Sequence, residues 1–181
     1  MINVKVELED LTDDYSIKTI SLPCDIRTQI DRDHEYVIIS CEPDLDIGDN
    51  NDIEKLNRVL DSINNENPEM TAEYLSILLG NSSARDLFDE DFLRRIEEND
   101  FMFEDISEID WLMSPEETAG CYLATELKIP FDEGVTEKIL DLLDSSVLVD
   151  YVNWKDVWRQ YEAIGFRLVS KDDNTYILHW R

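Results

Sequence analysis

Residues 88–111, FDEDFLRRIEENDFMFEDISEIDW, combine a dense acidic charge with enough apolar side chains for a folded core. Ten of these 24 residues are Asp or Glu, and only Arg94 and Arg95 are basic. Phenylalanine, isoleucine and tryptophan recur through the same stretch, and a disordered acidic tail would lack them. The segment therefore has to fold although its surface carboxylates repel one another.

The whole chain shares this imbalance. Its 181 residues include 43 acids and 16 bases, which gives a formal net charge of −27 at pH 7 beside a hydrophobic fraction of 43%. Such a charge opposes binding to nucleic acid or to an anionic membrane. We therefore expect neither among its partners, and expect a basic partner such as a metal ion or a protein that holds DNA.

The acids are unevenly distributed. Residues 31–69 hold twelve acids and three bases, residues 86–144 hold nineteen and four, and residues 147–181 hold five of each. Adaptation to high salt would make every segment acidic. The balanced C-terminal segment argues against that explanation. It favours acids that are concentrated where they serve a function.

The sequence also predicts the compartment. It has no run of 18 apolar residues, and its N-terminus MINVKVELED is neither a signal peptide nor a basic transit sequence. Cys24, Cys41 and Cys121 are widely spaced and form no CxxC pair, so we expect free thiols in a reducing environment. These features favour the cytoplasm.

The hydrophobic patterns predict an α+β fold. Three strands are expected in the first part of the chain, at residues 3–8, 15–23 and 35–42, with the third strand central in a small antiparallel sheet. Asp52 is expected to cap a helix over residues 53–63, which ends at the Asn- and Pro-containing run that follows.

Short helices and a terminal hairpin are expected in the rest of the chain. The hairpin covers residues 166–180 with its turn at Asp172–Asn174, and Gly165 closes the last helix. The helices are predicted over residues 71–80, 83–99, 103–113, 115–128, 135–146 and 152–165. This outline predicts an elongated chain of three small modules: an N-terminal antiparallel sheet plus helix (1–66), a central acidic short-helix bundle (67–112) and C-terminal helices plus a β-hairpin (113–181).

Two patterns raise the possibility of a metal site. Residues 44–55 resemble a calcium loop, but Gly48 falls at position five and Lys55 at position twelve, where such a loop needs Gly at six and Glu at twelve. Pro115-Glu116 and Glu126-Leu127-Lys128 loosely resemble a nuclease motif, but they lie on a predicted helix rather than at strand ends. We expect no metal site.

No other catalytic constellation is present. His34 and His179 are far apart in the sequence, and Trp154 and Trp158 follow the helical spacing of core residues. The chain has no nucleophile motif, phosphate-binding loop or dinucleotide fingerprint. We therefore expect that the protein is not an enzyme and uses no cofactor.

The acids themselves are then the candidate functional residues. Acids three or four residues apart on a helix lie about 5–6 Å from one another. Duplex DNA carries about one charge per 1.7 Å, so 27 net charges correspond to about 46 Å of duplex. A folded core that holds carboxylates in a fixed pattern could thus imitate DNA. The expected acidic surface comprises Asp44, Asp46, Asp49, Asp52, Glu54, Asp86, Asp89, Glu90, Asp91, Glu97, Glu98, Asp100, Glu104, Asp105, Glu108, Asp110, Glu116 and Glu117.

Residues 22–63 resemble the ArdA antirestriction proteins, and the C-terminal part follows the order of the same family. The similar residues in the first region are Leu22-Pro23-Cys24-Asp25, Glu35-Tyr36-Val37-Ile38, Asp46-Ile47 and Ile53-Glu54-Lys55-Leu56-Asn57. The later ones are AGCYLATELK, Val149-Asp150-Tyr151, WRQYEAIGF and the aromatic hairpin. SIKTIS stands where the family usually has Gly and Trp, and residues 67–112 match no family motif.

This resemblance implies a fold and a function. It implies a three-module protein that forms a head-to-head homodimer, whose curved acidic surface mimics bent B-form DNA. The implied target is the DNA-binding groove of Type I restriction–modification enzymes, within their specificity and methyltransferase subunits. Genes of this anti-defence family travel on plasmids, transposons and phages.

Three alternatives stay open. A DNA-mimic anti-CRISPR protein, or an inhibitor of another DNA-binding protein, would use the same mechanism on a different target. An acidic adaptor or immunity-type protein would cover a basic toxin as a compact monomer and would not compete with DNA. A metal-dependent enzyme would be revealed by activity with Mg²⁺ or Mn²⁺.

Overall fold

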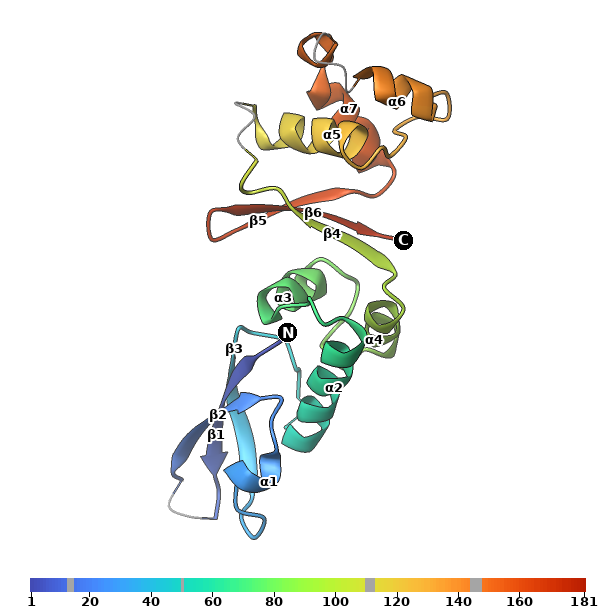
Figure 1. Ribbon diagram of the computed structural model, residues 1–181. Coiled ribbons are helices and arrows are strands. Elements are labelled where there is room, and N and C mark those ends of the chain that lie inside the picture. Colours follow the sequence, from blue (N-terminus) through green and yellow to red (C-terminus); the bar gives the residue numbers. More distant parts are fainter. Residues whose placement is uncertain (13–14, 50, 110–112, 144–147) are drawn as a thin grey trace. The chain divides into compact units, whose positions relative to one another are not determined.

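The computed structural model describes residues 1–12, 15–49, 51–109, 113–143 and 148–181. Over these residues it confirms the α+β class, with two three-stranded antiparallel sheets and seven α-helices (Figure 1). The chain divides into two compact units, residues 1–100 and 101–181. This division differs from the three expected modules, because residues 67–100 belong to the same unit as the N-terminal sheet.

The first sheet is built on β1, Val4–Asp10. It lies between β2, Ile17–Leu22, and β3, Tyr36–Glu42, so the expectation that the third strand is central was wrong. The physical reason is burial: alternate residues of β1 are fully buried, whereas only Ile38 of β3 is. The β-rich composition of β3 does not distinguish an edge strand from a central one.

Two asparagines of helix α2, Ile53–Glu66, bond to the backbone just before β1 and just after β2. Asp52 caps it as expected, accepting a hydrogen bond from the Lys55 N–H at 2.9 Å. Asn57 accepts from the Cys24 N–H at 2.8 Å and donates to the Cys24 carbonyl at 3.1 Å. Two turns later, Asn64 makes the same pair of bonds with the backbone of Ile2, at 2.6 and 3.2 Å. The amides therefore fix the helix against two points of the chain.

Replacing Asn57 by Ala should lower the free energy of unfolding of the first unit by about 1–3 kcal/mol. The change leaves a partly buried N–H and carbonyl of Cys24 without their partner. Asn65→Ala, at an exposed position of the same helix, is the matched control and should change it by less than about 0.5 kcal/mol. Urea denaturation followed by far-UV circular dichroism compares the two; equal effects would contradict the role of the Asn57 amide.

The remaining helices of the first unit are short. They are α1, Ile26–Gln29; α3, Ala72–Gly80; and α4, Glu90–Glu97. The helix predicted over 71–80 is confirmed, but the one predicted over 83–99 is too long. Asp86 accepts from the Phe88 N–H at 2.8 Å and Asp89 caps α4, so acids of this segment form turns before the helix begins.

The second unit contains a strand that the sequence analysis missed. Residues 103–113 were expected to be helical, but β4, Phe101–Asp105, pairs with β6, Asn174–Trp180, and residues 110–112 lie outside the described part. Phe101 packs on the Trp180 ring and Phe103 on the Tyr176 ring, with centroids 5.9 and 5.2 Å apart. These partners lie more than seventy residues away in sequence, so a local pattern does not show them.

The closing hairpin agrees with the prediction. β5, Arg167–Lys171, pairs with β6 in the order β4-β6-β5. Lys171 opposes Asn174, which leaves Asp172 and Asp173 as a two-residue turn with φ of 49° and 67°. Positive φ at both central residues is the signature of a type I′ turn.

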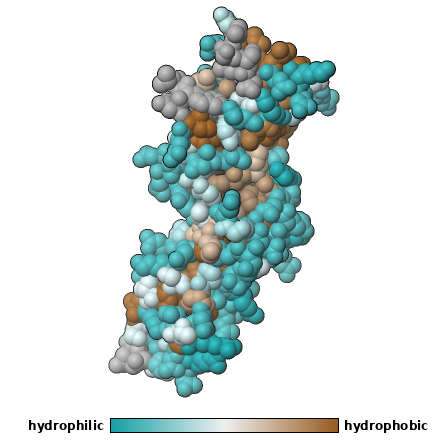
Figure 2. Space-filling model, in the orientation of Figure 1, coloured by the Kyte–Doolittle hydropathy of each residue, from teal (hydrophilic) through white to brown (hydrophobic). Residues whose placement is uncertain are grey.

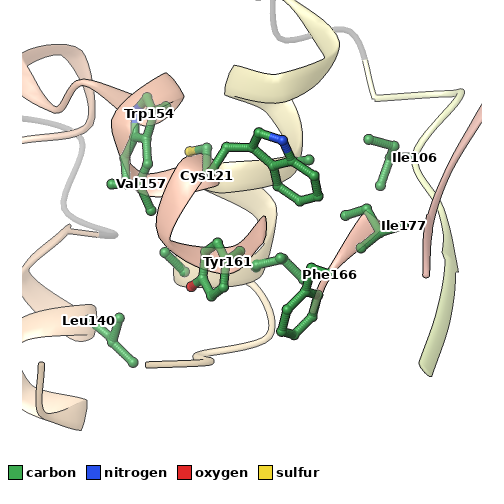
Figure 3. Packing of buried hydrophobic residues seen from close by; sticks show 12 residues of the cluster. Ile106, Cys121, Leu140, Trp154, Val157, Tyr161, Phe166 and Ile177 are labelled. Atoms are coloured by element: carbon green, nitrogen blue, oxygen red, sulfur yellow. The ribbon is translucent and has the colours of Figure 1, made fainter. Parts of the chain in front are cut away.

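Helices cover this second sheet. They are α5, Pro115–Thr125; α6, Glu137–Leu143; the 3₁₀ segment η1, Val149–Tyr151; and α7, Trp154–Ala163. Gly165, with φ of 104°, follows the end of α7 as expected. Figure 3 shows the core between these elements, where the rings of Tyr161 and Phe166 meet edge to face at 5.3 Å.

Gly120 sets the distance between α5 and α7. A Cβ atom at this position would lie 2.5 Å from the Trp154 carbonyl oxygen and 3.0 Å from the Trp158 backbone nitrogen. Because both atoms belong to the backbone of α7, neither can move without moving that helix. The close contact therefore depends on the absence of a side chain at residue 120.

Candidate acidic binding surface

The structure places the predicted acids at or near the surface. Those described are all exposed or half-buried, and Asp110 lies outside the described residues. Figure 2 shows hydrophilic residues over most of the visible face of each unit. The half-buried acids are Asp86, Asp89, Asp100, Glu104, Glu116 and Glu117. The acids form two groups, one in each unit, with the division after Asp100.

Several acids are fixed by the backbone. The carboxylates of Asp44, Asp86 and Asp105 each accept from the N–H two residues further along, at 3.0, 2.8 and 2.9 Å. Asp52 and Asp89 accept from N–H groups in the first turns of α2 and α4. These bonds restrict the carboxylate to one orientation while leaving its charge at the surface.

Ion pairs reduce the charge of α4. Arg94 pairs with Asp91 at 2.7 Å and also with Glu98, and Arg95 pairs with Asp100 at 3.4 Å. The hydrogen bond from Arg94 holds the pKa of the Asp91 carboxyl below its ordinary value. Three of the acids chosen from the sequence therefore have a guanidinium partner, and their negative charge is partly neutralised.

Eight other exposed acids of the candidate set have no such partner. Within the described parts of the chain, no basic side chain lies within 4.0 Å of their carboxylates. We call them the open acids: Asp44, Asp46, Asp49, Glu54, Glu90, Glu97, Asp105 and Glu108. Because no basic side chain of the described residues neutralises these eight carboxylates, they are well suited to attract a basic partner.

No family model, curated protein or solved structure matches this chain. A function has to be argued from the fold and from the arrangement of its carboxylates.

The acids of the second unit are more closely tied to structure. Ser114 and Glu117 form a capping box at the start of α5, with bonds of 3.0 and 3.4 Å. The Ser114 backbone N–H, and then its hydroxyl, lower the pKa of Glu117. Glu104 accepts from the Tyr122 hydroxyl at 3.1 Å; burial first, and then this carboxylate, raise the pKa of Tyr122.

The sequence analysis missed further surface acids. They lie in both units. Those of the second unit include Glu126, Asp132, Glu133, Glu137 and Asp141, which are exposed and belong to the acidic stretch 86–144. For the first unit, the acid excess of residues 31–69 was the signal that could have included most of them. Those of the first unit include Asp25, Asp31, Asp33, Glu35, Asp61, Glu66 and Glu69, all exposed. The acidic surface of the first unit is therefore broader than the candidate set.

The free thiols and the histidines of the chain lie in separate local environments. Among the described residues, no three His, Cys, Asp or Glu side chains converge as metal ligands, and no helix has the length and apolar character needed to cross a bilayer. Cys24 and Cys41 are free thiols whose pKa is raised by burial first and by Asp25 and Asp44 second, which lowers their reactivity. His34 contacts Asp10 at 2.6 Å, whereas His179 stacks on Phe166.

Proposed function

We propose that this protein is a non-enzymatic DNA mimic that inhibits a host defence enzyme by occupying its DNA-binding groove. The proposed target is a Type I restriction–modification complex, at its specificity and methyltransferase subunits. The observation that supports this function best is the set of open acids, which lie exposed on folded units without basic partners. The resemblance of residues 22–63 and of the C-terminal part to the ArdA proteins supports the choice of target, and implies a homodimer.

Rigid placement of charge is the physical basis of the proposal. A groove that binds DNA presents cations at fixed spacings, so a flexible polyanion would lose conformational entropy on binding. Carboxylates on helices, or fixed by backbone N–H groups as at Asp44 and Asp105, have lost most of that freedom before binding. Opposite charges also accelerate association at low salt.

Competition with DNA tests the proposal. The protein is titrated into a Type I methyltransferase core bound to fluorescent duplex DNA, and anisotropy reports displacement. We expect displacement at near-stoichiometric protein at physiological salt, and a weaker effect as the screening length falls to about 3 Å at 1 M salt. An unstructured polyglutamate of 27 residues is the control for charge alone and should displace DNA poorly.

The outcomes separate the alternatives. An affinity that does not depend on salt, or displacement equal to that by polyglutamate, would contradict rigid mimicry. No displacement from the methyltransferase would contradict the target, and the same assay on a DNA-bound CRISPR effector would then test the anti-CRISPR alternative. A protein that displaces DNA from neither would favour the acidic adaptor, and an assay for activity with Mg²⁺ or Mn²⁺ would then test the metal-dependent enzyme.

A further inference from the structure

A groove runs along one edge of the first sheet. It has a volume of about 240 Å³ and is lined on one side by residues 38–41 of β3. The loop that follows the strand forms the other side, with Asp44, Asp46 and Ile47 among its residues. A chain segment in this groove would therefore lie directly beside the backbone of β3.

The edge of β3 is open to another strand. In the described part of the chain β3 has β1 as its single strand neighbour, so its other side has backbone N–H and carbonyl groups that no strand pairs. Edge strands are commonly protected by lysine, by proline or by a β-bulge, and the strand YVIISCE contains no lysine, arginine or proline. Its register with β1 shifts by one residue at Ile39, so an added strand would pair on either side of this irregularity. The edge strands β2 and β5 both carry basic residues, whereas β4, the other edge strand of the second sheet, carries none.

The groove is acidic and partly apolar. Two carboxylates and no basic side chain line it, and Asp49 is exposed in the same loop. Asp44 also contributes to the raised pKa of Cys41, after burial, so its field reaches the strand. Ile39 is 45% exposed and Ile47 is half-buried, which gives apolar surface to an incoming side chain.

The outer wall is already formed. The Asp46 carbonyl accepts from the Leu87 N–H at 2.8 Å, and the Asp44 carboxylate accepts from the Asp46 N–H at 3.0 Å. The loop is thus anchored both to itself and to the segment before α4. A ligand would not need to order this wall on binding, which lowers the entropic cost of association.

We propose that a basic, extended segment of a partner protein adds to β3 as a fourth strand, with its main chain on residues 38–41 and its lysines or arginines facing Asp44 and Asp46. In such strand addition the main-chain hydrogen bonds supply affinity, and the alternate side chains supply specificity. The acidic loop selects a cationic sequence. The inference does not depend on DNA mimicry, because it concerns a strand edge and one loop rather than the whole acidic surface.

A peptide with selectively blocked N–H groups tests strand addition. The probe is an end-blocked octapeptide of alternating lysine and valine, added to the ¹⁵N-labelled full chain. Two N-methylated versions carry methyl groups on one or the other set of alternate residues, so each keeps the charge but loses the N–H groups of one side. We expect the parent peptide to slow amide exchange within residues 38–41. One methylated version should lose about tenfold or more in affinity, and the other should bind like the parent.

A pair of charge variants tests the acidic wall. Asp44→Asn with Asp46→Asn keeps the turn, since Asn accepts the same bond and tolerates the positive φ of residue 46, which is 45°. This double variant should bind the peptide about fivefold to tenfold more weakly. Glu133→Gln with Glu137→Gln, in the second unit, is the control and should bind like the natural protein. Equal binding of both methylated peptides, protection outside residues 38–41, or equal effects of the two double variants would overturn the proposal.

Discussion

Converting six open acids to amides should weaken the affinity for the DNA-binding target, measured by displacement of DNA, about 100-fold without unfolding the protein. The six are Asp46→Asn, Asp49→Asn, Glu54→Gln, Glu90→Gln, Glu97→Gln and Glu108→Gln. Each carboxylate is exposed and has no basic partner within the described residues, so its loss breaks no internal ion pair. An exposed charge pair contributes about 0.5 kcal/mol, and six together about 3 kcal/mol, which is a factor of about 100 in affinity. Each single change should weaken this affinity less than about threefold.

The control variant removes six acids from elsewhere and carries the same net charge. It replaces Glu133, Glu137, Asp150, Glu162, Asp172 and Asp173 with their amides, all at exposed positions of the second unit. Its affinity for the target, measured by displacement of DNA, should fall less than about fivefold. Equal losses in the two variants would mean that net charge alone governs binding. Loss of all binding on one single change would point instead to a specific pocket.

Gly120→Ala should destabilise the second unit by about 3 kcal/mol. The added methyl group would lie 2.5 Å from the Trp154 carbonyl oxygen, so α5 and α7 have to separate. Forcing an atom into a close-packed interface costs about 1–3 kcal/mol, and here the obstacle is backbone rather than a flexible side chain. The separation would also loosen the packing around Trp158, which is 2% exposed.

Tryptophan fluorescence measures this effect in one unit only. All four tryptophans of the chain lie after residue 101, so their emission in urea reports the second unit. Gly80→Ala is the matched control, because a Cβ atom there meets no other atom within 4 Å. It should leave the tryptophan transition unchanged. A Gly120→Ala midpoint equal to that of the natural protein would show that the two helices adjust at no cost.

Local signals in the sequence predicted much of the fold. Asp52 as a helix cap, Ser114-Pro115 as a helix start and the Asp172–Asn174 turn all depend on hydrogen bonds or φ values within a few residues. The strand β4 depends instead on β6, more than seventy residues further along the chain, and the central place of β1 depends on β3 as well as on the neighbouring β2. Local propensity does not show which strands pair, so the strand Phe101–Asp105 is evident only from its pairing with β6 in the structure.

The candidate surface was predictable in composition and less so in detail. That the acids lie at the surface follows from the cost of burying a charge. The partners of Arg94 lie at the ordinary helical spacings of three and four residues, so its ion pairs could have been predicted from the sequence. The pair between Arg95 and Asp100 could not, because it depends on the turn at the end of α4. The sequence likewise does not separate Asp86, which shapes a turn, from Glu90, which has no ion pair among the described residues.

The aspartates that hold turns and caps make the charge of this fold adjustable in small steps. Asparagine accepts the same backbone hydrogen bonds as aspartate and caps helices about as well. Five such aspartates can therefore be replaced by asparagine, singly or together, with the backbone hydrogen bonds retained: Asp44, Asp52, Asp86, Asp89 and Asp105. Each replacement makes the net charge of −27 less negative by one unit. The result is a series of proteins of nearly the same shape that differ only in net charge. Binding, solubility and electrophoretic mobility can each be measured as a function of that charge.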